Sequence, residues 1–145
     1  MKIRVWVLFV VVLAIACGAG AQVAVGANSC PGDTVDRMGP EIATQSRAFL
    51  AKLKAAVQAR DKSKVSQMVS YPLQVNRSSK TIHIKNREEF VRRYDTIVNA
   101  IVSAKIIDEA SSRCLFSNSQ GFMIGDGEVW FKGLSPGVFK IITIN

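Results

Sequence analysis

The chain opens on an apolar run that follows a short basic segment. Val5–Ile15 is apolar throughout, Lys2 and Arg4 precede it, and the small-x-small sequence Ala19-Gly20-Ala21 follows it. This order is typical of a bacterial export signal. The run is shorter than the about 20 residues that a bilayer-spanning helix needs. We therefore predict a signal peptide over residues 1–21, no transmembrane span in the mature protein, and a periplasmic or secreted location.

The next predicted elements are a flexible arm over residues 22–39 and a long amphipathic helix. The arm is rich in Gly, Asn, Ser, Pro and Asp, residues typical of loops. Gly39-Pro40-Glu41 then has the composition of a helix start, because proline is tolerated in the first turn and a carboxylate favours that end. Apolar residues follow at helical spacing: Ile42, Phe49, Leu50, Leu53, Ala56 and Val57. We predict a single domain over residues 40–145.

A short second helix and a hairpin are predicted next. Asp61 can cap a helix that carries Val65 and Met68, and Tyr71-Pro72 ends it because the residue before a proline avoids helical geometry. Alternating apolar residues on either side of a turn at 76–80 then indicate two paired strands: Leu73, Val75, Ile82 and Ile84.

A third helix is the most strongly patterned element. Asn86 stands three residues before Glu89, which is the spacing of a capping box. An apolar stripe at helical spacing continues from that cap: Phe90, Tyr94, Ile97, Val98, Ile101 and Val102. We predict one continuous helix through this stripe.

Beyond Asp108 the pattern changes to alternation with glycines, which predicts three antiparallel strands at 113–117, 121–131 and 138–144, with turns at 117–120 and 132–136. Asp126-Gly127 within the middle segment is also a hairpin signal. We favour one long bent strand there, because hairpin arms of four residues leave 113–117 without a good partner. A phosphate-binding loop lacks its third glycine and its helix.

The net positive charge of the chain bears on which classes of partner it can bind. The sequence carries 19 basic and 11 acidic residues, a net charge of +8. Loss of Lys2 and Arg4 with the signal leaves +6. The remaining basic residues are spread over several predicted elements, as on a solvated surface. We expect no nucleic-acid partner, because an exported protein meets anionic lipid and wall polymers instead.

Three cysteines become one pair when the signal is removed. Cys17 lies in the signal, and Cys30 and Cys114 remain in an oxidising compartment. We predict a disulfide between them that holds the arm; the alternative is two free thiols. Leu13–Cys17 also loosely matches a lipobox, with leucine one place too early, so a lipoprotein acylated at Cys17 is the minor alternative for localisation.

Four segments carry a family resemblance: Tyr71-Pro72-Leu73, Asn86–Phe90 with Tyr94-Asp95, Gly121–Phe131, and Ile141–Asn145. Together with the element order they resemble small exported proteobacterial proteins of uncharacterised function with a domain of the nuclear transport factor 2-like superfamily. The resemblance implies an α+β cystatin-like cone, in which three N-terminal helices pack on a strongly curved antiparallel sheet. It implies no particular catalytic residues.

The resemblance also implies a pocket between the sheet and the long helix. Enzymes of this superfamily place an Asp, His or Tyr in that pocket for proton transfer. The apolar stripe puts Tyr94 inward, as a core residue or a pocket residue. Glu128 and Trp130 share one strand face, so Glu128 is a buried acid or base if Trp130 faces the cone and an exposed acid otherwise. We take Tyr71, Tyr94, Glu128 and Trp130 as candidate pocket or interface residues. Only Glu128 and Tyr94 are weak catalytic candidates.

Other catalytic chemistry has little support in the sequence. His83 is the only histidine, and its place between Ile82 and Ile84 predicts a surface position. We expect no metal site, because a lone histidine without a carboxylate cluster does not make one, and no cofactor. A nucleophilic hydrolase also lacks an arranged Ser or Cys with its histidine.

Three functions follow, in order of preference. The first is a non-enzymatic exported protein that binds a small ligand or an envelope protein through the cone or the sheet face, as a possible homodimer. The second is a small-molecule isomerase, cyclase or dehydratase that uses Glu128 with Tyr94. The third is an inhibitor or immunity protein against a wall-active enzyme, which the positive charge disfavours because many such enzymes are basic.

Overall fold

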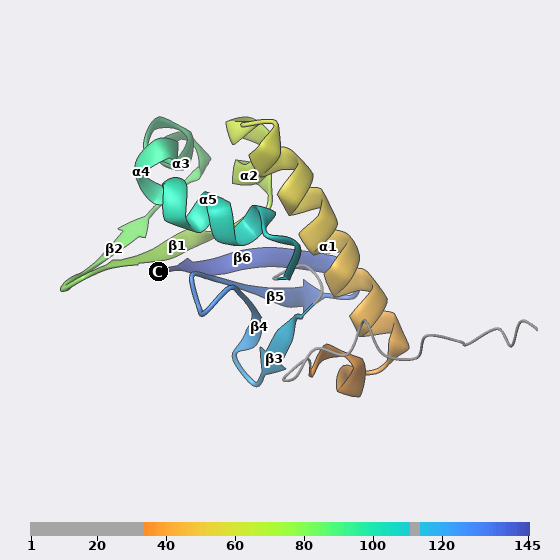
Figure 1. Ribbon diagram of the computed structural model, residues 1–145. Helices are drawn as coiled ribbons and strands as arrows, with labels where there is room; N and C mark the ends of the chain where they lie inside the picture. The colour runs from red at the N-terminus through yellow and green to blue at the C-terminus, as the bar shows by residue number, and fades with distance from the viewer. Residues whose placement is uncertain (1–33, 111–113) are drawn as a thin grey trace, which may run out of the picture.

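A computed structural model describes residues 34–110 and 114–145 of the chain. Figure 1 shows helices on one side of a single sheet. The elements are η1 (Val35–Met38), α1 (Pro40–Gln58), α2 (Lys62–Gln67), β1 (Val69–Arg77), β2 (Lys80–Ile84), α3 (Arg87–Arg92), α4 (Tyr94–Ile97), α5 (Ala100–Ile107), β3 (Phe116–Asn118), β4 (Gly121–Ile124), β5 (Val129–Ser135) and β6 (Val138–Ile144).

The six strands form one mixed sheet in the order β2-β1-β6-β5-β4-β3. The predicted α+β class is therefore correct, but the sheet is not purely antiparallel. β1 and β6 run parallel, because helices and four strands separate them in the chain and no hairpin turn fixes their direction. Their register shifts between Val69 and Gln74, the stretch that contains Pro72, whose nitrogen has no proton to donate to a neighbouring strand.

The first helices and the first hairpin follow the predicted pattern. Asp61 Oδ1 accepts a hydrogen bond from the Lys64 backbone N–H at 2.9 Å and so caps α2. In the β1–β2 hairpin Leu73 lies opposite Ile84 and Val75 opposite Ile82. The strands extend closer to the turn than predicted, and β1 begins at Val69 rather than after Tyr71-Pro72.

The predicted third helix is correct at its start and wrong in its continuity. Asn86 Oδ1 accepts from the Glu89 backbone N–H at 2.9 Å, as the capping pattern predicts. The backbone then leaves helical geometry at Arg93 and again at Val98, which divides the stripe into α3, α4 and α5. Asn99 restarts the helix by accepting a hydrogen bond from the Val102 backbone N–H. The restart changes the helical phase, so Ile101 is exposed.

The glycine-rich segment is a hairpin, so the preferred prediction of one long strand is wrong. Phe122 pairs with Phe131 and Ile124 with Val129 across a turn in which Gly125 and Gly127 have φ of +69° and +114°. The argument for a long strand fails because β3 is short and finds its partner in the four-residue strand β4. The turn predicted at 132–136 is also shorter, since β5 continues to Ser135.

The core lies between the helical layer and one face of the sheet. Phenylalanine rings from both layers meet there: Phe49 of α1 lies 4.8 Å from Phe131 of β5 between ring centroids, and Phe122 stacks on Phe131 at 5.1 Å. Val35 of η1 is fully buried in the same core. Residues 34–39, which the sequence assigns to the arm, therefore contribute to the packed domain.

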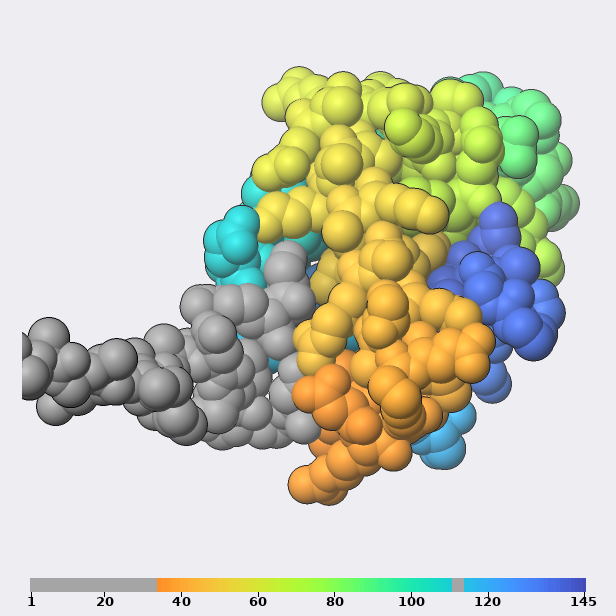
Figure 2. Space-filling model, turned by 90° about the vertical axis from the view of Figure 1, so that its right-hand side faces the viewer, coloured from red at the N-terminus to blue at the C-terminus, as the bar shows by residue number. Residues whose placement is uncertain are grey.

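Figure 2 shows α1 crossing the molecule from its orange first turns to its yellow last turns, with blue residues of the carboxyl-terminal strands beside its first half. Among the described residues, no helix combines the length and the apolar character that crossing a membrane would require. The predicted signal peptide lies outside the described residues, so it stays a prediction.

Candidate functional site

Tyr71 lies near the start of β1, where its side chain packs against Phe90 of α3. Its ring meets that of Phe90 edge to face at 6.4 Å between centroids. Its hydroxyl donates to the backbone oxygen of Ser66 at 3.0 Å, and burial raises the pKa of Tyr71 to about 12. A phenol that is already hydrogen-bonded and hard to deprotonate serves packing rather than proton transfer.

Tyr94 points inward, as the apolar stripe predicts, and only 4% of it is exposed. Its ring packs edge to face on Phe90 at 5.9 Å, so both candidate tyrosines share this neighbour. Burial, and next the negative charge of Asp95, raise the pKa of the Tyr94 hydroxyl. Tyr94 also lines a hollow of about 460 Å³ between the end of α1 and the start of α5, together with Arg60 and Asn99.

Glu128 lies in the β4–β5 turn, not on a strand face. One carboxylate oxygen accepts from the backbone N–H of Asp126 at 2.6 Å, and the other lies 4.0 Å from Lys105 Nζ of α5. Lys105 in turn donates to the Asp126 carboxylate at 2.6 Å, and this hydrogen bond and the two negative charges raise the pKa of Lys105. Glu128 therefore stabilises a turn, and it lines none of the three hollows described here.

Trp130 lies on the sheet face opposite the helices. Its neighbours Val129 and Phe131 are fully buried on the helical side, which turns the Trp130 side chain to the other face. The tryptophan therefore does not bring Glu128 into the core. The four candidate residues occupy three separate places, and the pairing of Glu128 with Tyr94 that the enzyme hypothesis requires does not occur.

The remaining sequence candidates are a histidine and two cysteines. His83 is exposed on β2, as predicted. Within residues 34–110 and 114–145, no three His, Cys, Asp or Glu residues gather as metal ligands would. Cys30 lies outside the described residues, so its disulfide with Cys114 stays a prediction.

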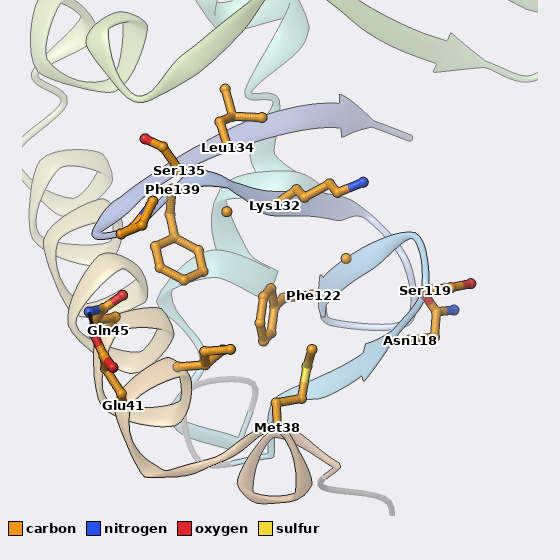
Figure 3. Close-up of a pocket in the computed structure, with 14 residues that line it drawn as sticks. Met38, Glu41, Gln45, Asn118, Ser119, Phe122, Lys132, Leu134, Ser135 and Phe139 are labelled. Carbon is orange, nitrogen blue, oxygen red and sulfur yellow. Dashed lines mark hydrogen bonds between the residues drawn. The ribbon is translucent and has the colours of Figure 1, made fainter.

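A pocket of about 530 Å³ opens beside the first half of α1. We call it the α1–hairpin pocket, because its walls are η1, α1, the β3–β4 turn and the β5–β6 hairpin. Figure 3 shows the rings of Phe122 and Phe139 pointing into it, with Met38 rising from η1. Both phenylalanines belong to the core, so the pocket floor is the exposed edge of the hydrophobic core.

Apolar side chains also stand exposed around this pocket. Among the described residues five large apolar side chains are exposed, and three of them line this pocket: Met38 (42% exposed), Ile42 (38%) and Leu134 (54%). The other two are Val138 on β6 and Ile101 on α5. An apolar cluster of this kind on a protein surface marks a site of contact with a ligand or partner.

Charged groups of the pocket stay at its rim. Glu41 of α1 holds the side-chain amide of Gln45 at 3.0 Å. Lys132 of β5 extends along the opposite rim, away from the rings (Figure 3). The pocket interior is therefore apolar, with one acidic and one basic group at its edge. Such a site can hold an apolar body and orient a polar end, but it has no acid–base pair within it.

Sequence reasoning missed this pocket because its residues fall in segments that it assigned to other roles. Met38 lies in the predicted arm, Leu134 in a predicted turn, and Ile42 on the predicted core face of α1. One signal in the sequence could have indicated it: Met38 and Leu134 are large apolar residues in segments predicted as an arm and a turn, where polar residues are more common.

Comparisons with known protein families, with curated proteins and with solved structures find no match for this chain.

Proposed function

We propose that this chain is an exported, non-enzymatic binding protein of the nuclear transport factor 2-like superfamily that holds a small, largely apolar ligand in the α1–hairpin pocket. The element order supports the fold: a long and a short helix, a hairpin, further helices and then four strands. More specifically, we propose that the helices and the sheet form a cone and that the cone opens at this pocket. The export signal rests on the sequence pattern of residues 1–21.

The single observation that carries the binding function is the gathering of exposed apolar side chains around the pocket. Complete burial of a leucine or isoleucine side chain contributes about 1.5–3 kcal/mol, so leaving several of them exposed forgoes considerable stability. Met38, Ile42 and Leu134 line one hollow whose floor is aromatic. A ligand of matching shape would recover that burial when it binds.

The pocket size favours a small ligand as the occupant. Its volume of about 530 Å³ lies within the range of small-molecule sites, which is about 300–1,000 Å³. Lys132 at the rim suits an anionic end group on the ligand. An amphipathic molecule with an apolar body, such as a fatty acid, combines both properties.

The test is a binding titration of the purified mature protein with anilinonaphthalene sulfonate, followed by displacement with a long-chain fatty acid. Ile42→Glu places a carboxylate against the apolar wall, and we expect it to weaken binding at least about tenfold, because an unpaired buried charge is costly. Ile101→Glu is the matched control, since it makes the same change at an exposed apolar residue outside the pocket.

Two results would contradict the proposal. One is equal binding by the Ile42→Glu and Ile101→Glu variants while both remain folded by circular dichroism. The other is a wild-type protein that neither binds the dye nor is protected from thermal unfolding by the fatty acid. Native mass spectrometry of protein prepared from the envelope would show whether it retains a small molecule or another protein. A retained protein would mean that the pocket is a protein-binding site rather than a small-molecule site.

A further inference from the structure

The face of the sheet that points away from the helices carries a second hollow with a different chemistry. Cross-strand pairing places Trp130 of β5 beside Thr143 of β6, and Thr143 beside Gln74 of β1. A hollow of about 400 Å³ lies over these residues and also reaches Asn76, Gln120 and Asn145. The helical layer does not cover this face, as Figure 1 shows. The α1–hairpin pocket is lined instead by α1 and by the core residues Phe122 and Phe139.

The side chains that line this hollow are neutral. They are amide, hydroxyl, indole and aliphatic side chains and include no Asp, Glu, Lys, Arg or His. The whole chain has 19 basic and 11 acidic residues, so a hollow of this size without a charged side chain is a local departure from its surface. A neutral polar ligand fits the hollow better than an anion, a cation or a nucleic acid.

The amides of the hollow are fixed by a chain of hydrogen bonds. Gln74 Nε2 donates to Asn76 Oδ1 at 3.2 Å, and Asn76 Nδ2 donates to Asn145 Oδ1 at 2.7 Å. Asn145 Nδ2 then donates to the backbone oxygen of Gly127. Thr81 also donates to Asn76 Oδ1, so the Asn76 side chain is held from several sides. A preorganised amide presents its remaining donor or acceptor sites at little entropic cost.

Several polar groups of the hollow keep unused bonding capacity. Among the described residues, the Trp130 indole N–H, the Thr143 hydroxyl and the Gln120 side-chain amide have no hydrogen-bond partner in the protein, and neither does Gln74 Oε1. These groups stand beside a partly exposed indole ring. A ring face next to several neutral donors and acceptors is what a sugar requires, because its C–H face stacks on the ring while its hydroxyls bond at the edge.

We propose that this sheet face binds a neutral saccharide, with Trp130 as the stacking platform and the amides of Gln74 and Gln120 as hydroxyl partners. We call it the Trp130 face. The proposal does not depend on the function proposed for the α1–hairpin pocket, because the two sites share no lining residue. For a protein exported to the envelope, wall and surface glycans are the available polymers.

The fluorescence of Trp130 can report binding at this face. The sequence has two tryptophans, and Trp6 lies in the predicted signal peptide, so Trp130 is the only one in the mature protein. We would titrate the mature protein with tetrasaccharides of N-acetylglucosamine, cellotetraose and maltotetraose up to about 10 mM, because this range would detect a binding free energy as small as about 4 kcal/mol, which corresponds to a dissociation constant of about 1 mM. We expect a change in tryptophan emission with at least one of them.

Variants then locate the site by calorimetry, which needs no tryptophan. Trp130→Ala should weaken binding of that sugar at least about tenfold, and Gln120→Ala a few-fold. Ile42→Glu is the control at the other site, and it should leave sugar binding unchanged. If only Ile42→Glu weakens it, the sugar binds in the α1–hairpin pocket and the proposal fails.

Three further outcomes would overturn the saccharide proposal. They are no emission change with any of the sugars, sugar binding that survives in folded Trp130→Ala, and a wild-type dimer that Trp130→Ala converts to a monomer. The last result, measured by analytical ultracentrifugation, would assign the face to self-association. Fatty-acid binding can succeed or fail independently of each of these results, so the two proposals are separable.

Discussion

The two ends of the layer between helices and sheet differ in what their apolar side chains do. At the end beneath α3 and α4, Leu53, Phe90 and Ile97 are at most 1% exposed. At the η1 end, Met38, Ile42 and Leu134 are 38–54% exposed around a hollow of about 530 Å³. At the first end, which we call the closed end, these apolar residues are buried, although the hollow of about 460 Å³ that Tyr94 lines also lies there. At the second, open end the apolar residues are exposed and line the pocket itself.

This difference suggests a division of roles within one core: the residues at the closed end stabilise the fold, and those at the open end bind another molecule. Removing a buried side chain at the closed end leaves a cavity, whereas removing an exposed one at the open end leaves water where water already was. Residues that contribute little to folding but remain apolar are the ones whose purpose lies in contact with another molecule. The predictions below test whether the two ends differ in this way.

The largest effect is expected for the predicted disulfide between Cys30 and Cys114, which are close in the sequence to Thr34 and Ser117. The described chain already comes together there: Thr34 Oγ1 accepts from the Ser117 backbone N–H at 2.7 Å and lies 2.9 Å from the Ser117 backbone oxygen, to which it donates. In the chain-entropy model, a bridge that closes this long loop stabilises the fold by about 4 kcal/mol. Urea unfolding of the Cys30→Ser variant should show a loss of that size relative to the oxidised protein.

Mass spectrometry provides the control for the bridge. Alkylation of the unreduced, unfolded mature protein should leave both cysteines unlabelled. Two labelled thiols, or equal stability of wild type and Cys30→Ser, would contradict the predicted bridge. A mass that includes a diacylglycerol on Cys17 would move the protein to the membrane surface as a lipoprotein.

The second prediction compares the two ends directly. Leu53→Ala at the closed end should destabilise the protein by about 3 kcal/mol, because Leu53 is fully buried and the cavity cannot fill. Leu134→Ala at the open end should cost less than about 0.5 kcal/mol, because surface substitutions away from packed features fall in that range. Chemical denaturation of both variants measures the contrast.

Similar losses for the two leucines would contradict the comparison. They would mean that the β5–β6 hairpin supports the fold and that the pocket is a consequence of packing. The opposite pattern in ligand titrations completes the test, since Leu134→Ala should weaken binding in the α1–hairpin pocket and Leu53→Ala should change it little while the protein stays folded.

The closed end is also the part that sequence reasoning predicts well. Helical periodicity identifies α1 and the alternation of Leu73 with Val75 identifies β1, because burial on one face imposes a period on the sequence. The spacing of Asn86 and Glu89 predicts a cap that the structure confirms. The break at Arg93 is not predictable in this way, since no proline or glycine marks it.

The open end escaped prediction for a physical reason. A pattern of apolar residues shows which face seeks burial, but not whether the fold has enough surface to cover it. Ile42 continues the stripe of α1 and still has 38% exposure, because it lines the pocket of about 530 Å³ instead of packing against the sheet. Tyr94 is predicted from the apolar stripe of a helix, and Glu128 from the face of a strand that the β4–β5 turn interrupts. A pattern within one element does not bring side chains of two elements to one place.

The smallest predicted effect concerns Glu89 at the helix start that covers the closed end. Its carboxylate accepts from the Lys85 backbone N–H at 2.9 Å, and this hydrogen bond, followed by that from Arg93, lowers the pKa of Glu89. A lowered pKa in the folded state means that Glu89 stabilises the fold above its unfolded pKa, near 4.5, and that this contribution disappears as pH falls through the folded pKa. Glu89→Gln should therefore lower the melting temperature slightly at neutral pH and less in acid.

Glu88→Gln is the matched control, because it makes the same charge change in the same helical turn. If Glu88→Gln reproduces the pH dependence, net charge rather than the cap explains it, and the closed end has one specific contact fewer than the structure indicates.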